Sequence, residues 1–436
     1  MKILYVVHNG FWNEFTGTPL IARQYIQFAL QRNWEVALMV PEDVGTAAFG
    51  VGDAFSRLKV LQWPVMANWP MDAYQDLPAT NESSRNIGAE FAPDIVHIID
   101  WVNIHPSVLV ALKELRVPIL RHVWNMEDIC AFISPIRFQP DHSACEFPLP
   151  AGQCGVCYAR TMPVNIQGYQ GTLGDLKGMI DRDFAGLVNA YAGAIDNKWR
   201  TFQRQQGLFD HLIFPCESFR AYFESAAHIQ IPVSVIEHGL PASDKRPAKI
   251  REGGCLNLVF LGGLEERKGW PAVEAAVEKM LNTNHRERIN LRVYGALGTN
   301  GYVGKLAAYP QVQFLGRFAP AELEHILAWA DVGILPTHFE TYCRVVREFI
   351  LNGVVPVASK AFGIPDVIQD GFNGILLDRP HDAALLSAIE RLLTVDGLLD
   401  ILREGVLHTK VVSDSAEYAK LETLYKLEIS KSRSAK

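Results

Sequence analysis

The sequence predicts an α/β protein built of two Rossmann-like domains, each with a doubly wound parallel sheet. Two observations support this prediction. With 436 residues the chain is too long for one compact core, so two domains of about 200 residues each are expected. Short apolar runs of strand length also alternate with helical patterns along most of the chain. Such alternation is typical of parallel sheets that carry helices on both faces.

In the first half the alternation begins at the amino terminus, where Ile3–Val7 is an apolar run and Leu20–Arg32 is an amphipathic segment after a polar loop. Further strands are expected at Val36–Val40, Ile95–Ile99, Pro118–Val123, Leu212–Phe214 and Val233–Glu237. Helical patterns occupy Pro106–Leu115 and roughly Ala159–Gly207. We therefore expect the first domain at residues 1–240.

The turn-rich, charged stretch 241–254 is the best linker in the sequence, and the alternation restarts after it. Strands are expected at Leu256–Leu261, Ile289–Tyr294, Val312–Phe314, Val332–Leu335 and Val354–Ala358, and helices at Trp270–Leu281, Ala321–Trp329, 343–352 and 382–394. The second domain is thus expected at residues 255–413. A charged helix at 414–432 carries Tyr418, Leu421 and Leu424 on one face, with which it is expected to pack back on the first domain.

The composition describes an ordinary folded protein, with 49% hydrophobic and 20% charged residues. A net charge of −7 and a pI near 6.0 argue against a nucleic-acid partner, which requires a broad basic face. The first residues lack the length of a secretory signal, and no apolar run approaches a membrane span. We expect a cytoplasmic protein, and peripheral contact with the inner face of a membrane is left open.

The segment between Phe339 and Gly374 is the most informative about function. It places two carboxylates, Glu340 and Glu348, on either side of an expected helix start. Helix amino termini bind phosphate, because their first backbone N–H groups lack intrahelical acceptors and the helix dipole is positive there. Carboxylates beside such a site are suited to sugar hydroxyls. The pair therefore suggests a nucleoside diphosphate linked to a sugar.

The stretch from Glu340 to Glu348, with the flanking ADVGILPTHFE, NGVVPVASKAFGIPDVI and DGFNGILL, resembles the E-x7-E signature of retaining glycosyltransferases of family 4, which have the GT-B fold. The resemblance implies that Glu340 contacts the donor sugar and that Glu348 binds the ribose of the nucleotide. It also implies that the backbone amides of Cys343, Arg344 and Val345 meet the sugar and the diphosphate. A solvent-facing helix is the alternative interpretation.

The segment 258–269 (LVFLGGLEERKG) resembles a strand followed by the family's G-R-L-x-x-x-K-G motif, in which an Arg and a Lys neutralise the diphosphate. Lys268 occupies the Lys position. Gly263 occupies the Arg position, which is a departure from the family. Arg267 could supply the second charge, or could be an exposed helix residue. Arg317 is also assigned to the donor-binding set.

In the first domain the candidate residues depart further from the family. Gly17 lies in the loop where relatives carry a glycine-rich turn that approaches the ligand closely. The position of a donor-positioning His holds Trp124, which could stack on a sugar ring. His122, two residues earlier on the same strand face, could serve instead, and a buried structural histidine is the competing interpretation.

Four of the seven cysteines fall within one polar segment. Cys130, Cys145, Cys154 and Cys157 include a CxxC pair, and they are compatible with a closed structural zinc site that stabilises an insertion at about 128–158. Free thiols or a single disulfide are the alternative.

Taken together, the resemblance implies a GT-B glycosyltransferase whose two domains face each other across a cleft. It would move a sugar from a nucleoside-diphosphate sugar (UDP, GDP, ADP or dTDP) to the hydroxyl of a carbohydrate or glycolipid acceptor. Retention at the anomeric carbon and independence of metal ions are implied by the family, and a role in cell-surface polysaccharide or glycolipid synthesis is expected. The alternatives are a catalytically silent sugar-nucleotide sensor or scaffold subunit, and an NDP-sugar epimerase.

Overall fold

The computed structural model describes residues 1–7, 17–41, 59–63, 78–101, 104, 106–130, 135–136, 144–165, 173–241, 255–296 and 304–434. The chain forms two compact units. The first contains residues 1–215, 220–236 and 418–436, and the second contains residues 216–219 and 237–417. The expected linker at 241–254 lies outside the described residues except for Pro241.

The first unit contains a parallel sheet of seven strands in the order β3-β2-β1-β4-β5-β6-β7. Its strands are β1 (Lys2–Val6), β2 (Glu35–Pro41), β3 (Lys59–Trp63), β4 (Ile95–Ile98), β5 (Ile119–His122), β6 (His211–Phe214) and β7 (Val233–Val235). Its helices are α1 (Thr18–Gln31), α2 (Pro78–Phe91), α3 (Pro106–Lys113), α4 (Ala151–Asn165), α5 (Leu173–Gln205), most of α6 (Glu217–Ala226) and most of α12 (Asp414–Ser434).

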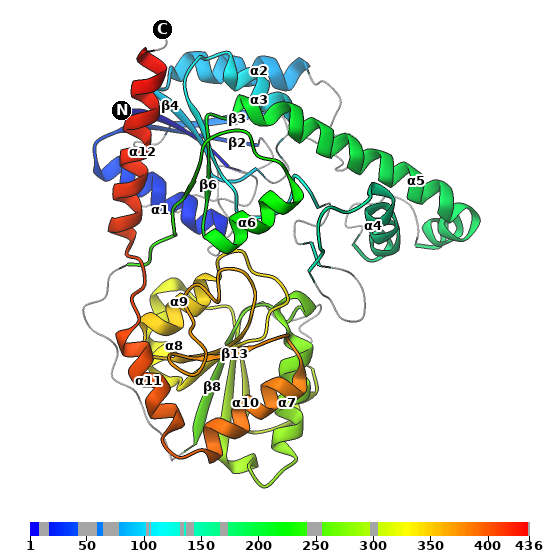
Figure 1. Cartoon of the computed structure of the whole chain (residues 1–436), viewed down its shortest axis with the longest axis vertical. Coiled ribbons are helices and arrows are strands. Elements are labelled where there is room, and N and C mark those ends of the chain that lie inside the picture. The colour runs from blue at the N-terminus through cyan, green and yellow to red at the C-terminus, as the bar shows by residue number, and fades with distance from the viewer. Residues whose placement is uncertain are drawn as a thin grey trace. The chain divides into compact units, whose positions relative to one another are not determined.

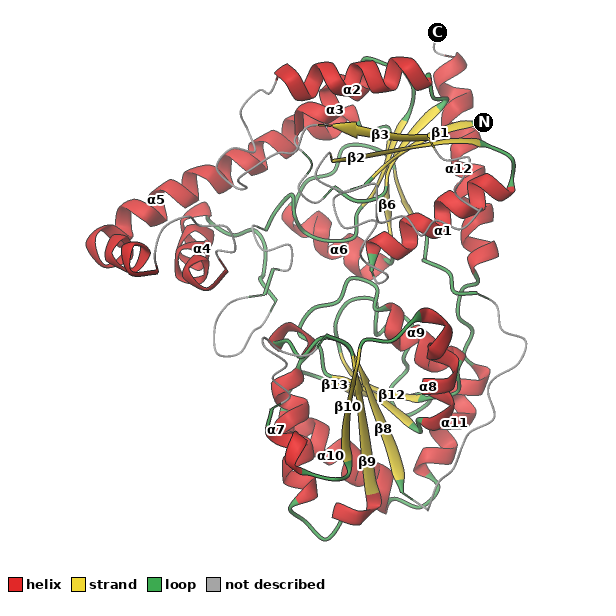
Figure 2. Ribbon diagram, turned by 180° about the vertical axis from the view of Figure 1, so that it is seen from behind, coloured by secondary structure: helices red, strands yellow, loops and turns green. Residues whose placement is uncertain are grey.

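One face of this sheet is covered by helices from the two ends of the chain. Apolar side chains of α1 pack in one buried cluster with those of β1, β2 and β4, and Leu421, Leu424 and Tyr425 of α12 complete the cluster. The helices α2 and α3 lie on the other face (Figure 1). The long helix α5 extends away from the sheet with α4 packed against it (Figure 2). The carboxy-terminal helix is therefore part of the first core.

The second unit contains a parallel sheet of six strands in the order β10-β9-β8-β11-β12-β13. Its strands are β8 (Leu256–Leu261), β9 (Ile289–Tyr294), β10 (Val312–Gly316), β11 (Val332–Leu335), β12 (Val355–Ser359) and β13 (Ile375–Leu377). Its helices are α7 (Trp270–Leu281), α8 (Leu323–Trp329), α9 (Arg344–Leu351), α10 (Asp382–Thr394) and α11 (Leu398–His408).

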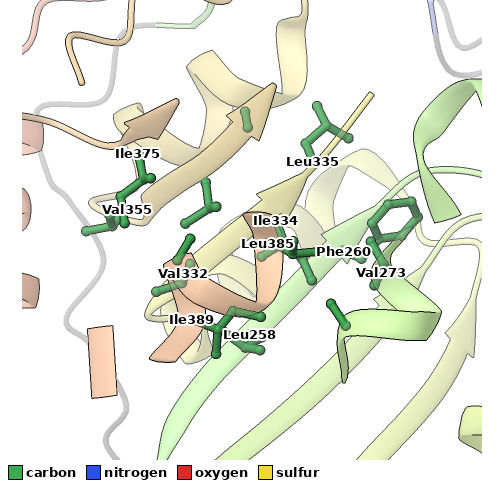
Figure 3. Close-up of a cluster of buried hydrophobic side chains, with 14 of the residues drawn as sticks. Leu258, Phe260, Val273, Val332, Ile334, Leu335, Val355, Ile375, Leu385 and Ile389 are labelled. Carbon is green, nitrogen blue, oxygen red and sulfur yellow. The ribbon is translucent and has the colours of Figure 1, made fainter. Parts of the chain in front are cut away.

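The central strands of the second sheet are buried on both faces because helices cover each side. Along β8, Leu258 and Phe260 face one apolar cluster while Val259 and Leu261 face another, as the period of two in a strand requires. Figure 3 shows Leu258 and Phe260 with neighbouring strand residues against α7 and α10. This rigid, doubly covered sheet fixes the loops at its carboxyl edge. Among the described residues, no helix has both the length and the apolar character needed to cross a membrane.

Candidate functional site

The second sheet has a topological switch point between β8 and β11. These strands are neighbours, and the chain continues outward from them in opposite directions, to β9 and β10 on one side and to β12 and β13 on the other. In open α/β sheets the loops diverge at such a point, and ligands bind beyond the carboxyl ends of its strands. The loops after β8 and β11 carry the predicted residues Lys268 and Glu340.

The structure brings Lys268 and Glu340 into direct contact. The ammonium group of Lys268 donates a hydrogen bond to Oε1 of Glu340, and the guanidinium of Arg267 lies 4.0 Å from the same oxygen. The backbone N–H of His338 and the hydroxyl of Thr337 both donate to the carbonyl of Arg267, each at 2.9 Å. The two loops therefore form one structure that presents cations beside a carboxylate.

The amino terminus of α9 lies in the same loop as Glu340. Cys343 precedes the helix in a left-handed conformation, with φ of 60°, and the first turn contains no acidic residue. The first amides of a helix lack intrahelical acceptors, so those of Cys343, Arg344 and Val345 are suited to an anion. Burial, with a smaller contribution from the charge of Glu340, raises the pKa of the Cys343 thiol to about 12. A thiol with a pKa this high is protonated at neutral pH.

Glu348 lies one helical turn further along α9. The Nε of Arg344 donates to its Oε1 at 2.6 Å, in an i,i+4 ion pair. The side chains of Glu348 and Arg344 retain 13% and 22% of their exposure, so both are accessible from solvent while the pair fixes their orientation. The helix whose first amides are suited to an anion thus also carries the carboxylate that the resemblance assigns to the ribose.

Tyr342 and Arg347, which no sequence motif predicted, hold this loop in place. Arg347 is 1% exposed, and its guanidinium donates to the carbonyls of Tyr342 and Gly363 and lies 3.7 Å from the centre of the Tyr342 ring. The signal was present in the sequence, because Arg347 lies among the apolar residues Val346 and Ile350 of the expected helix. A charge within an apolar helix face needs buried partners.

Gly269 allows the loops after β8 and β11 to approach each other. Its φ is 75°, and a Cβ there would lie 1.6 Å from the carbonyl oxygen of Pro336. We expect Gly269→Ala to weaken nucleotide binding and to lower the free energy of unfolding by about 1–3 kcal/mol, because the loops must separate. Gly397→Ala is the matched control: its φ is 74° with no atom near the added Cβ, so it should cost about 1 kcal/mol and leave nucleotide affinity unchanged. Equal effects of both variants on affinity, measured by calorimetry, would contradict the role of the loop contact.

Two further residues, Arg317 and Gly17, were predicted to bind the donor. Arg317 is exposed and follows the edge strand β10, so β9 separates it from β8. Gly17 is in the first unit, where it precedes α1 with φ of 63°, and residues 8–16 of its loop lie outside the described residues. Their assignment to the donor stays a prediction.

His122 and Trp124 lie at the carboxyl end of β5 in the first unit. His122 is 1% exposed, its Nδ1 lies 2.7 Å from Nε2 of His97, and its Nε2 lies 3.4 Å from the hydroxyl of Tyr25. The indole of Trp124 stacks on its ring with centroids 4.9 Å apart. Nδ1 of His97 in turn lies 2.6 Å from the hydroxyl of Tyr425 of α12. Burial lowers the pKa of His97 to about 3. Both ring nitrogens of His122 thus have protein partners, and its assignment to donor binding stays a prediction.

None of the four cysteines of the insertion forms a disulfide. Burial, with smaller contributions from Cys145 and Cys157, raises the pKa of Cys154 to about 12. Among the residues that the structure describes, no group of three or more His, Cys, Asp or Glu side chains is arranged to hold a metal ion. In this structure Cys130, Cys145, Cys154 and Cys157 are therefore not arranged as a set of zinc ligands. The zinc site stays a prediction that metal analysis of the purified protein decides.

The chain is similar to known proteins in sequence. Residues 256–395 match the profile of the family described as glycosyl transferases group 1. A D-inositol 3-phosphate glycosyltransferase of Corynebacterium kroppenstedtii is 24% identical over 212 residues, which are 45% of this chain and 46% of the relative. The match thus spans about half the length of that curated relative.

Solved structures extend the fold similarity to nearly the whole chain. Sucrose-phosphate synthase from Thermosynechococcus elongatus superposes with a TM-score of 0.67 at 15% identity, covering 99% of both chains. The Anabaena protein HepE, solved in complex with UDP and glucose, superposes with a TM-score of 0.60 at 15% identity, covering 97% of this chain and 99% of its own. Residues 256–395 are therefore similar to the glycosyl transferases group 1 family, and the chain as a whole has the GT-B fold.

Proposed function

We propose that this protein transfers a glycosyl group from a nucleoside-diphosphate sugar to an acceptor hydroxyl, with retention at the anomeric carbon. The observation that carries the proposal is the contact between the Lys268 ammonium and the Glu340 carboxylate at the switch point of the second sheet, with the start of α9 in the same loop. Cations and helix amides suit a diphosphate, and a carboxylate beside them suits sugar hydroxyls.

In the proposed reaction the bond between the anomeric carbon and the diphosphate oxygen breaks, and a bond to the acceptor oxygen forms. The acceptor proton goes to the departing phosphate oxygen, and the nucleoside diphosphate leaves. Lys268, assisted by Arg267 and the amides of 343–345, stabilises the negative charge that grows on the diphosphate. Glu340 orients the sugar and Glu348 accepts hydrogen bonds from the ribose. Because these groups supply the positive charge, the proposal requires no metal ion.

The comparisons support a sugar nucleotide as donor and leave the base open. HepE was solved with UDP and glucose, which makes UDP-glucose the first donor to test. The acceptor is proposed to be a carbohydrate or a glycolipid, as in cell-surface polysaccharide synthesis. The protein is proposed to act in the cytoplasm, with peripheral contact at the inner face of the membrane if the acceptor is a lipid.

Release of nucleoside diphosphate tests this function. Purified protein is incubated with UDP-, GDP-, ADP- and dTDP-sugars and a panel of saccharide and glycolipid acceptors. We expect acceptor-dependent release from one donor. A sugar-nucleotide sensor without catalysis is the second candidate, because Gly263 stands where relatives place a diphosphate-binding Arg. Saturable binding without release across the whole panel would favour the sensor.

The two carboxylates are expected to affect different parameters. Glu348→Ala should weaken nucleoside-diphosphate binding by about 1–3 kcal/mol, because a ribose hydroxyl loses its acceptor. Glu340→Ala should lower kcat more than nucleotide affinity, because its contact is to the sugar. Calorimetry with the nucleotide and initial-rate kinetics with the full donor separate the two effects. Unchanged parameters in both variants would show that the site is assigned wrongly.

A further inference from the structure

A hydrogen-bonded chain runs through the second unit from the buried Glu417 to the partly exposed Glu348. Nδ1 of His238 lies 3.1 Å from Oε2 and 3.2 Å from Oε1 of Glu417, and its Nε2 lies 2.5 Å from NH1 of Arg344. Nε of Arg344 then donates to Glu348. His238 and Glu417 are both 0% exposed. Neither residue is part of the signature assigned to the donor.

The partners of His238 determine where its proton lies. A guanidinium has only donors and stays protonated, so Nε2 must offer its lone pair to Arg344. The carboxylate of Glu417 only accepts, so Nδ1 must carry the proton and donate to it. His238 is therefore a neutral imidazole in the Nδ1–H form. A second buried donor to Glu417, the N–H of Gly239 at 2.8 Å, holds the carboxylate in place.

The backbone around His238 is held as firmly as its ring. The hydroxyl of Tyr342 donates to the carbonyl of His238 at 2.5 Å. The segment 237–240, where the chain enters the second unit, pairs with the segment 412–414, where it leaves. The backbone N–H of Leu240 donates to the carbonyl of Val412 at 2.9 Å, and the N–H of Asp414 donates to the carbonyl of Leu240 at 3.0 Å. The imidazole therefore has a fixed position relative to α9.

We propose that His238 is a positioning residue for the donor site, held by Glu417 and acting through Arg344 on Glu348. An arginine on a helix surface has many rotamers, and fixing it costs up to about 2 kcal/mol in conformational entropy. Here one nitrogen of the guanidinium is fixed by His238 and another by Glu348. Because the guanidinium of Arg344 is planar and rigid, the position of the His238 ring determines where Arg344 can hold the Glu348 carboxylate. This inference rests on the proposed function, because it concerns the carboxylate assigned to the ribose.

Two variants at His238 separate positioning from simple packing. The side-chain amide of Gln reaches the position of Nε2, whereas that of Asn reaches only the position of Nδ1. His238→Asn should therefore lose the contact with Arg344 and raise the dissociation constant for UDP or GDP about tenfold or more. His238→Gln retains an oxygen that can accept from Arg344, and it should bind the nucleotide several-fold more tightly than His238→Asn. Both variants remove the ring, so equal losses of affinity would overturn the proposal.

A second readout does not depend on the nucleotide. In ¹⁵N NMR spectra of the imidazoles, the signal that disappears in His238→Gln should be that of a neutral ring protonated on Nδ1 at neutral pH. A ring protonated on Nε2, or an imidazolium, would overturn the positioning role. If the wild-type protein binds none of the four nucleoside diphosphates, the proposed function fails, and the NMR result then judges the geometry by itself.

Discussion

Lys268→Met should lower kcat/KM for glycosyl transfer by about 10²–10³-fold, because it removes a cation aimed at the charge that develops on the departing diphosphate. The side chain is 19% exposed and its ammonium is already held against Glu340. A group fixed in this way stabilises the transition state without reorganisation. Methionine preserves most of the apolar stem, so the fold should be retained. Initial rates of nucleoside-diphosphate release measure the effect, and circular dichroism confirms the fold.

Lys279→Met is the matched control for this variant. Lys279 lies on α7 of the same unit, where it is 56% exposed and forms an ion pair with Asp382. Exposed pairs contribute about 0–1 kcal/mol, so this variant should transfer at close to the wild-type rate. If Lys268→Met and Lys279→Met had the same rates, Lys268 would have no role in the reaction.

Arg121→Met should lower the free energy of unfolding of the first unit by about 3–5 kcal/mol. Arg121 is 1% exposed on β5, and its guanidinium forms two hydrogen bonds with Asp128, at 3.1 and 2.6 Å. Glu127 lies 3.5 Å away and is also buried. Burial and the charge of Asp128 raise the pKa of Glu127 well above its usual range. Removing the guanidinium leaves this acidic pair without its principal cation.

Chemical denaturation of Arg121→Met and of the control Arg85→Met measures how much each arginine contributes to the free energy of unfolding. Arg85 pairs with Glu114 at 2.5 Å, but the two side chains are 45% and 49% exposed. Its substitution should therefore cost no more than about 1 kcal/mol. A similar small cost for both variants would show that the buried group of the first unit does not contribute to stability as we infer.

The sequence was most informative where the relevant residues are contiguous. The central strands β8, β11 and β12 are buried along their whole length and mostly apolar, so the fold of the second unit could be predicted. Glu340 and Glu348 are eight positions apart on one loop and helix, so a local motif was enough to propose them as donor residues. Strands β3 and β13 were not expected. β3 is an edge strand that contains Lys59 and Gln62, and β13 has only three residues. Such strands carry a weak periodic signal.

The supporting residues of the site could not be found in the same way. Glu417 and His238 are 179 positions apart. Contacts of this kind depend on the tertiary fold, and no local sequence pattern predicts them. His238 follows an expected strand end, but a single polar residue there has many explanations. Its role became visible only through the partners of its two nitrogens.

A crystal structure of the protein with UDP or GDP tests the central claim most directly. We expect the diphosphate to contact the Lys268 ammonium and the amides of residues 343–345, with the ribose hydroxyls on the Glu348 carboxylate. A nucleotide bound away from the ends of β8 and β11, or crystals that take up no nucleoside diphosphate at saturating concentration, would contradict the assignment of this site.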